Sequence, residues 1–419
     1  MKKLSLSVAT LIALSSTTLL ADTASELAEL RAEIQELKEQ TSVLIDETSD
    51  LKTGFNYTTV DTTKAYSGLG AAASKVYYSK SPLSIGGYGE MYHARKSDGS
   101  SATDVYRFVP YIGYKFSDSI ILNTEIEFEH GGVANDGGAA KGGEVIVEFM
   151  YLDFLLNQHA NVRVGNFLVP MGLINERHEP TLFTTVQRPG TAKYLIPSTW
   201  HESGAMVYGD IIAGLEYKFA AISALKTGDN GSKWIRGGRT GSFKSSNPNL
   251  AYVARLDYTG TNGLLVGGSA YYGVANDAVT SDMIMFDVHF DYNLAGFRTY
   301  GTYTAVNRSD ANQFNSTNTD GSTNFAVESG NGGYINIGFD VLSLTQIDKK
   351  MPIFVQYETL NQQAKIADGS TNDAANTTTV GVNYFPHDQV VLKMDYAMAK
   401  AATGGNTDYT TSISMGFIF

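Results

Sequence analysis

From Leu83 to the C-terminus, the sequence alternates between apolar and polar residues with a period of two. The pattern is clearest over 119–130, where the two sets are Ile120, Leu122, Thr124, Ile126 and Phe128 on one side, and Asn123, Glu125, Glu127 and Glu129 on the other. This period is that of a β-strand with apolar surroundings on one face and water on the other.

About sixteen segments share this pattern: 83–95, 104–116, 119–130, 144–156, 160–169, 203–211, 215–226, 250–259, 263–275, 281–293, 296–307, 332–343, 352–361, 376–386, 388–399 and 407–419. Their connections alternate between short turns and long polar loops, the long ones near 131–143, 170–202, 227–249, 308–331 and 362–375. A soluble β-sandwich has no reason to sort its loops in this way. The sequence therefore predicts an all-β fold, a 16-stranded antiparallel transmembrane β-barrel over 83–419 with short turns on the periplasmic side.

The N-terminus carries features of export. Lys2 and Lys3 precede a mostly apolar run from Leu4 to Leu14, and Ala21 is followed by polar residues. The run is shorter than the roughly 20 residues of a membrane-spanning helix. We interpret residues 1–21 as a signal peptide.

A helical pattern follows the signal peptide. Across four heptads, the d positions are Leu30, Leu37, Leu44 and Leu51, and the a positions are Leu27, Ile34, Thr41 and Thr48. This narrow stripe predicts a short α-helical coiled coil in the periplasm over 22–54, with a helix packed on its own domain as the alternative. Residues 55–82 show no period and are predicted to be a linker.

Composition excludes several classes of function. A formal net charge of −12 disfavours nucleic-acid binding, which needs a basic surface. The chain has no cysteine and no His-Glu-x-x-His motif, so we predict no metal site and no cofactor. The sequence offers no convincing catalytic constellation, and we predict that the protein is not an enzyme.

Two local elements carry a resemblance to a known family. The last strand ends in the aromatic Phe419, and the stretch Gly165–Gly172 places a glycine, an aromatic, a valine and a proline at the start of the third long loop. With the signal peptide, the coiled coil and the strand count, these resemble the trimeric porins of Gram-negative bacteria. They are most similar to the phosphate-selective porin O/P type and to its relatives with an N-terminal coiled coil, such as the dicarboxylate porin DcaP. The resemblance implies a homotrimer in outer-membrane lipids, an inward third loop at about 170–202, and Phe419 as the signal for barrel assembly.

Charged residues on the wet face and in the third loop are the candidates for lining and constricting a pore. They are Arg107, Lys115, Glu125, Glu127, Glu129, Arg163, Glu176, Arg177, Arg188, Arg255, Arg298 and Lys393. Because both signs are mixed, phosphate specificity is not expected. We predict a passive diffusion channel for small hydrophilic solutes, anionic or zwitterionic. The alternative is a structural or adhesive protein that tethers the outer membrane to peptidoglycan through residues 22–54.

Overall fold

The computed structural model describes residues 30–45, 60–133, 135–136, 139–140, 142–228, 234–244, 249–275, 281–402 and 405–419. The chain divides into two compact units, residues 1–56 and 57–419. In the first unit, residues 30–45 form a helix whose side chains are all exposed. The predicted signal peptide 1–21, Leu27 and Leu51 lie outside the described residues. Among the described residues, no helix is long and apolar enough to cross a membrane.

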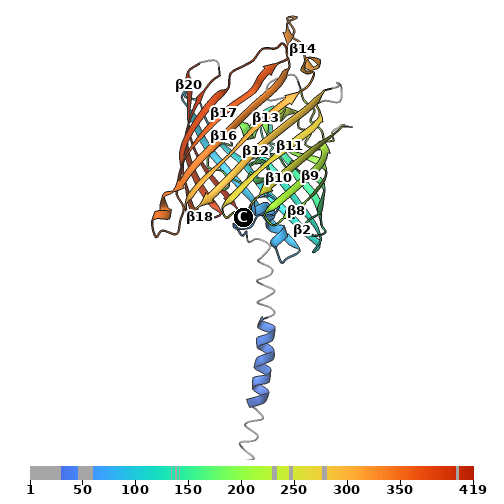
Figure 1. The fold of residues 1–419 in the computed structure, drawn as a ribbon. Coiled ribbons are helices and arrows are strands. Elements are labelled where there is room, and N and C mark those ends of the chain that lie inside the picture. Colours follow the sequence, from blue (N-terminus) through green and yellow to red (C-terminus); the bar gives the residue numbers. More distant parts are fainter. Residues whose placement is uncertain are drawn as a thin grey trace, which may run out of the picture. The chain divides into compact units, whose positions relative to one another are not determined.

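The second unit is a closed barrel of sixteen strands, each hydrogen-bonded to antiparallel neighbours (Figure 1). Its strands, in spatial order, are β1 (Leu83–Lys96), β2 (Ser101–Ser117), β3 (Ile120–Glu129), β6 (Val145–Leu155), β7 (Asn161–Leu168), β8 (His201–Ile212), β9 (Leu215–Ser223), β10 (Leu250–Tyr258), β11 (Leu264–Val274), β12 (Asp282–Leu294), β13 (Phe297–Arg308), β16 (Val327–Asp340), β17 (Pro352–Ile366), β18 (Ala375–His387), β19 (Val390–Lys400) and β20 (Thr407–Ile418). The predicted 16-stranded barrel is confirmed. The largest differences from the predicted boundaries are at β16, which begins at Val327 instead of 332, and at β17, which extends to Ile366 instead of 361.

Minor elements occupy the connections. The short strands are β4 (Asn135–Asp136), β5 (Ala139–Ala140), β14 (Ser316–Thr317) and β15 (Thr323–Asn324). The short helices are η1 (Asn175–Arg177), η2 (Thr191–Leu195), η4 (Arg236–Gly238), η5 (Ala311–Phe314) and η6 (Val341–Leu344). The β14–β15 hairpin lies at the long-loop end of the barrel (Figure 1).

The two faces of the barrel wall differ as the alternation predicted. Phe108, Ile112, Phe286 and Val288 are exposed on the outside. Glu127, by contrast, is 1% exposed. Carboxylates therefore face inward and apolar side chains face outward, which is the polarity that a hydrocarbon environment requires.

The barrel closes between its first and last strands. Gly87 and Phe419 exchange two backbone hydrogen bonds, each with an N–O distance of 2.9 Å. The Phe419 ring stacks on that of Phe108, with ring centroids 6.2 Å apart. The C-terminal residue thus completes the seam, leaving no free sheet edge.

Residues 60–82 differ from the predicted linker. Residues 71–78 form the helix α2 (Ala71–Tyr78), which packs on β1, β2 and β3 at the short-turn end (Figure 1). Its first six residues, from Ala71 to Val76, are all buried. Gly113 on β2 makes this close packing possible, since a Cβ there would lie 2.5 Å from Cγ2 of Val76. The linker prediction was wrong because the three alanines have small side chains that bury on every side and leave no apolar stripe in the sequence.

The connection between β7 and β8 folds inside the barrel. We call residues 169–200 loop 3. Its apolar side chains, including Met171, Leu195 and Trp200, are buried. The Asn175 side chain links the two ends of loop 3, because its amide donates to the carbonyls of Val169 (2.8 Å) and Trp200 (2.9 Å).

Candidate functional site

The interior of the barrel collects the charged residues predicted from the sequence. Those with buried side chains are Arg107, Glu125, Glu127, Arg163, Glu176, Arg188, Arg255 and Lys393. Those that keep partial exposure are Lys115, Glu129, Arg177 and Arg298. The interior is therefore a dense charge network, in which most of these groups contact a partner.

Arg107 on β2 forms the centre of an acidic group. Its guanidinium lies 3.2 Å from Glu90, 3.5 Å from Glu127 and 3.6 Å from Glu129. These carboxylates belong to β1 and β3, the two strands that pair with β2. One cation thus faces three anions across adjacent strands, and this part of the wall has a negative balance.

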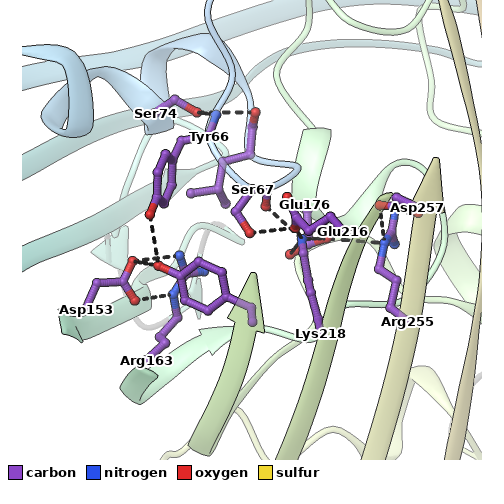
Figure 2. A network of polar contacts seen from close by, with 12 residues as sticks. Tyr66, Ser67, Ser74, Asp153, Arg163, Glu176, Glu216, Lys218, Arg255 and Asp257 are labelled. Atoms are coloured by element: carbon purple, nitrogen blue, oxygen red, sulfur yellow. Dashed lines mark hydrogen bonds and ion pairs between the residues drawn. The ribbon is translucent and has the colours of Figure 1, made fainter. Parts of the chain in front are cut away.

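A second group joins loop 3 to the wall and to the segment before α2. Lys218 on β9 donates to both carboxylate oxygens of Glu176, each at 2.8 Å, and to the carbonyl of Ser67 at 2.7 Å. Ser67 in turn donates to Glu216 at 2.8 Å (Figure 2). Arg255 approaches Glu176 at 3.8 Å from β10. Three parts of the chain therefore meet at a single buried ammonium.

A third group of polar contacts holds aromatic residues of the segment 60–79, which we call the inner segment. Arg163 on β7 forms a bidentate pair with Asp153 on β6, at 2.8 and 2.9 Å. Asp153 also accepts hydrogen bonds from Tyr77 of α2 (2.5 Å) and from Tyr208 (2.9 Å). Tyr66 lies beside Tyr208 in the same network (Figure 2). A bidentate arginine pair of this kind fixes geometry as well as charge.

Loop 3 contacts α2 directly. Glu179 accepts a hydrogen bond from the backbone N–H of Ala73 at 3.0 Å, at the positive end of the helix dipole. Gly70 allows this approach, because a Cβ there would lie 2.3 Å from the carboxylate. Burial raises the pKa of Glu179 to about 7, and the backbone N–H groups of α2 only partly oppose that shift. The contact is thus sensitive to protonation near neutral pH.

Loop 3 also reaches the opposite wall of the barrel. The carboxylate of Glu358 accepts from the backbone N–H groups of Gly190 (3.0 Å) and Thr191 (2.6 Å), and that of Asp395 accepts from Val186 (2.6 Å). Lys393 donates to the carbonyl of Phe183 at 2.9 Å. The inward charged side chains of β17 and β19 therefore hydrogen-bond to the backbone of loop 3 and hold it in place.

An open cleft remains between loop 3 and the long loops. It encloses about 230 Å³. Its charged lining consists of Glu127, Glu129 and Glu144 together with Arg236 and Arg239. The pKa of Arg239 falls to about 10, chiefly because of burial and then because of the neighbouring Arg236, so the side chain is still charged at neutral pH. Acidic and basic groups thus line one polar cleft.

Sequence reasoning missed Lys218, Glu148 and Asp153. On β9, the inward residues that follow Lys218 are the apolar Ala220 and Ile222, so Lys218 does not belong to a long row of polar residues. Strand β6 contains a bulge at Glu148, where the register shifts between Glu125 and Ile126 of β3. The bulge reverses the phase of the alternation along β6, so the sequence pattern did not predict that Glu148 and Asp153 point inward.

Comparisons with known proteins agree with this architecture. No family model matches the sequence. A protein of Aquifex aeolicus (strain VF5), described only as an uncharacterized protein, is 33% identical over 351 residues, which cover 80% of this chain and 79% of the relative.

Solved outer-membrane proteins share the fold at low identity. Salmonella typhi OmpF in complex with daunomycin aligns with a TM-score of 0.54 at 11% identity, covering 80% of this chain and 97% of that one. The trimer form of Vibrio cholerae OmpT gives 0.52 at 10%, covering 80% and 99%. The outer-membrane channel DcaP of Acinetobacter baumannii gives 0.51 at 12%, covering 80% and 97%. The fold is that of the outer-membrane porins, and by sequence the chain belongs to the same family as the Aquifex aeolicus protein.

Proposed function

We propose that the protein is a porin of the bacterial outer membrane, a passive diffusion channel for small hydrophilic solutes. One observation carries this proposal: a closed barrel of sixteen strands presents apolar side chains outward and a network of charges inward. Burying this many charged groups inside a barrel is costly unless the interior is polar and wet. The porin fold of the solved neighbours is consistent with this function.

We propose that the solutes are zwitterionic or anionic. The cleft of about 230 Å³ has Arg236 and Arg239 together with Glu127, Glu129 and Glu144 in its lining. Opposed charges across a narrow opening create a transverse field that orients dipolar molecules. A solute with both signs can satisfy both sets of groups while it loses part of its hydration shell.

We propose that residues 60–79 narrow the channel at its short-turn end. This segment packs against the inner face of β1, β2 and β3 and bonds to Lys218 and Asp153. Solute flux at that end then depends on how firmly the segment is held. Loop 3 and this segment together form the constriction, through the Glu179–Ala73 contact.

We propose that the protein is a homotrimer with a periplasmic coiled coil. In the helix 30–45, Leu30, Ile34, Leu37 and Leu44 are each at least 48% exposed, and these are the residues with heptad spacing. In the described part of the first unit this stripe is exposed, and self-association of the helix would bury it. The choice of three chains is supported by Vibrio cholerae OmpT, which has the same fold and a trimer form.

Planar-bilayer recording of the purified full-length protein tests the proposal. We expect stepwise conductance increments grouped in threes, and a reversal potential that shifts in a salt gradient. Absence of steps would contradict the channel function. If, in addition, residues 22–54 bound isolated peptidoglycan, the result would favour the alternative function, a structural protein that tethers the outer membrane to peptidoglycan.

A further inference from the structure

Three buried side chains from separate elements converge between loop 3 and the wall: Glu125 of β3, Glu148 of β6 and His178 of loop 3. One ligand atom from each lies within 4.8 Å of the others. Nε2 of His178 is 3.2 Å from Glu125 and 3.9 Å from Glu148. The side chains of the two glutamates are 0% exposed and that of His178 is 2% exposed.

The backbone places Glu148 in this group through an irregularity of β6. Phe149 pairs with Glu125 and Val147 pairs with Ile126, so Glu148 is the extra residue of a β-bulge. Both Glu148 and Phe149 are buried, although neighbours in a regular strand point to opposite faces. Bulges of this kind re-aim a side chain and are frequent beside functional sites.

The histidine presents a lone pair to the carboxylates. Its Nδ1 lies 2.7 Å from the backbone carbonyl of Asn175, which can only accept, so Nδ1 carries the hydrogen. With the hydrogen on Nδ1, the Nε2 atom of a neutral ring is an acceptor directed at the two carboxylates. A carbonyl on Nδ1 is also the usual outer partner of a metal-binding histidine.

Among the described residues, no Lys or Arg forms an ion pair with Glu125 or Glu148, and Arg188 and Arg107 act on them only from a greater distance. Neither oxygen of Glu148, nor Oε2 of Glu125, has a hydrogen-bond partner among the described residues. Arg107 forms ion pairs with Glu90, Glu127 and Glu129 instead. Three acceptors therefore face one another in a buried site, an arrangement that is unfavourable unless a positive charge lies between them.

We propose that Glu125, Glu148 and His178 form a binding site for a divalent transition-metal ion of the Zn²⁺ class, which fastens loop 3 to the barrel wall. One imidazole nitrogen and two carboxylate oxygens are a donor set that suits Zn²⁺, Mn²⁺ or Co²⁺ better than the all-oxygen preference of Ca²⁺. In a tetrahedral site with bonds of about 2.0–2.1 Å, donor atoms lie about 3.3 Å apart, close to the separations found between His178 and the two glutamates. A water or solute atom would complete the coordination.

The experiment uses the full-length protein in detergent, stripped with a chelator and titrated with Zn²⁺ by calorimetry. Metal content is measured independently by mass spectrometry, and Co²⁺ serves as a spectroscopic probe. We expect one Zn²⁺ per chain, and visible Co²⁺ bands of low-coordinate type.

Variants assign the ligands. Glu148→Gln and His178→Gln should weaken Zn²⁺ binding by more than about a hundredfold, since even outer-shell changes cost about 10- to 100-fold. Glu202→Gln and His289→Gln are matched controls, because Glu202 is buried with Thr240 and Trp200 as donors and His289 is buried between Asp287 and Asp257. Both controls should bind as the parent does.

The unmodified protein keeps the test decisive if a variant fails to fold. Absence of stoichiometric Zn²⁺ and Co²⁺ uptake at neutral pH would overturn the proposal and leave a proton shared between the glutamates as the way the site is neutralised. Uptake that persists in both Glu148→Gln and His178→Gln would overturn it as well. Neither outcome depends on whether the barrel conducts.

Discussion

Lys218 holds Glu176 in a buried ion pair with both N–O distances at 2.8 Å, and the same ammonium donates to the carbonyl of Ser67. The Lys218→Met variant would leave the Glu176 carboxylate buried with its closest cation removed. We expect a loss of about 3–5 kcal/mol in the free energy of unfolding, as for other broken buried pairs. Denaturant titration in detergent, followed by tryptophan fluorescence, measures it.

Lys365 provides the control for this experiment. Its ammonium pairs with Glu328 at 2.6 Å, but its side chain is 47% exposed. Lys365→Met should therefore cost about 0–1 kcal/mol. Equal losses in the two variants would show that the Lys218 network contributes nothing beyond an ordinary surface pair.

A charge on the packed face of α2 should release the helix from the wall. Val76 is 2% exposed, and its Cγ2 lies 2.5 Å from the position that a Cβ of Gly113 would take. The Val76→Asp variant would bury an unpaired carboxylate there, at a cost of about several kcal/mol. We expect a larger single-channel conductance, recorded in planar bilayers.

Thr62→Asp adds the same charge to residues 60–79 at an exposed side chain. Its conductance should stay close to that of the parent protein. An unchanged conductance in Val76→Asp, with a normally folded barrel, would mean that residues 60–79 do not limit flux.

Conductance should depend on pH through Glu179. Its pKa is about 7 when loop 3 contacts α2, against 4.5 for an unburied carboxyl, so the docked state binds the proton more tightly. Docking is then strongest below about pH 4.5 and weakens as pH rises through 7. We expect conductance to increase from about pH 5 to pH 8, and this increase to disappear in Glu179→Gln.

The upper limit of that pH range has a physical reason. Burial lowers the pKa of Lys75 on α2 to about 8, so docking strengthens again between about pH 8 and 10.5. Measurements above pH 8 would mix the two opposing effects. A conductance that falls between pH 5 and 8 would contradict the role given to Glu179.

Ion selectivity should respond to the cleft and not to the buried pairs. Neutralising Arg239, which lines the cleft, should shift the reversal potential toward cation preference. Arg163→Gln should leave the reversal potential in place and lower stability instead, because Arg163 is 1% exposed and paired with Asp153. A larger selectivity shift from Arg163 than from Arg239 would place the passage elsewhere.

The sequence was sufficient to predict the strands of the barrel wall but not the contacts made inside the barrel. Alternation at Glu125 and Glu127 predicted their inward direction, because a strand in a membrane barrel has one wet and one apolar face. Loop lengths predicted which end carries the long connections. These are local properties that each segment expresses on its own.

The interior contacts depend on residues that are far apart in the chain. Helix α2 gives no periodic signal, since Ala71, Ala72 and Ala73 bury equally well in any direction. The bulge at Glu148 is a property of the β3–β6 pairing and not of either strand alone. The partner of Lys218 could not be predicted either, because Glu176 belongs to a loop whose path no local pattern determines.

The seam between Gly87 and Phe419 has a consequence for biogenesis. Phe419 completes a wall around residues 60–79, which precede every barrel strand in the chain and are therefore synthesised before them. Those residues must be inside before the wall is sealed, or thread into a finished cylinder through an end already crowded by Tyr208 and Asp153. Sealing around a preplaced core is the simpler order of events, and it would give every copy its inner segment without a separate insertion step.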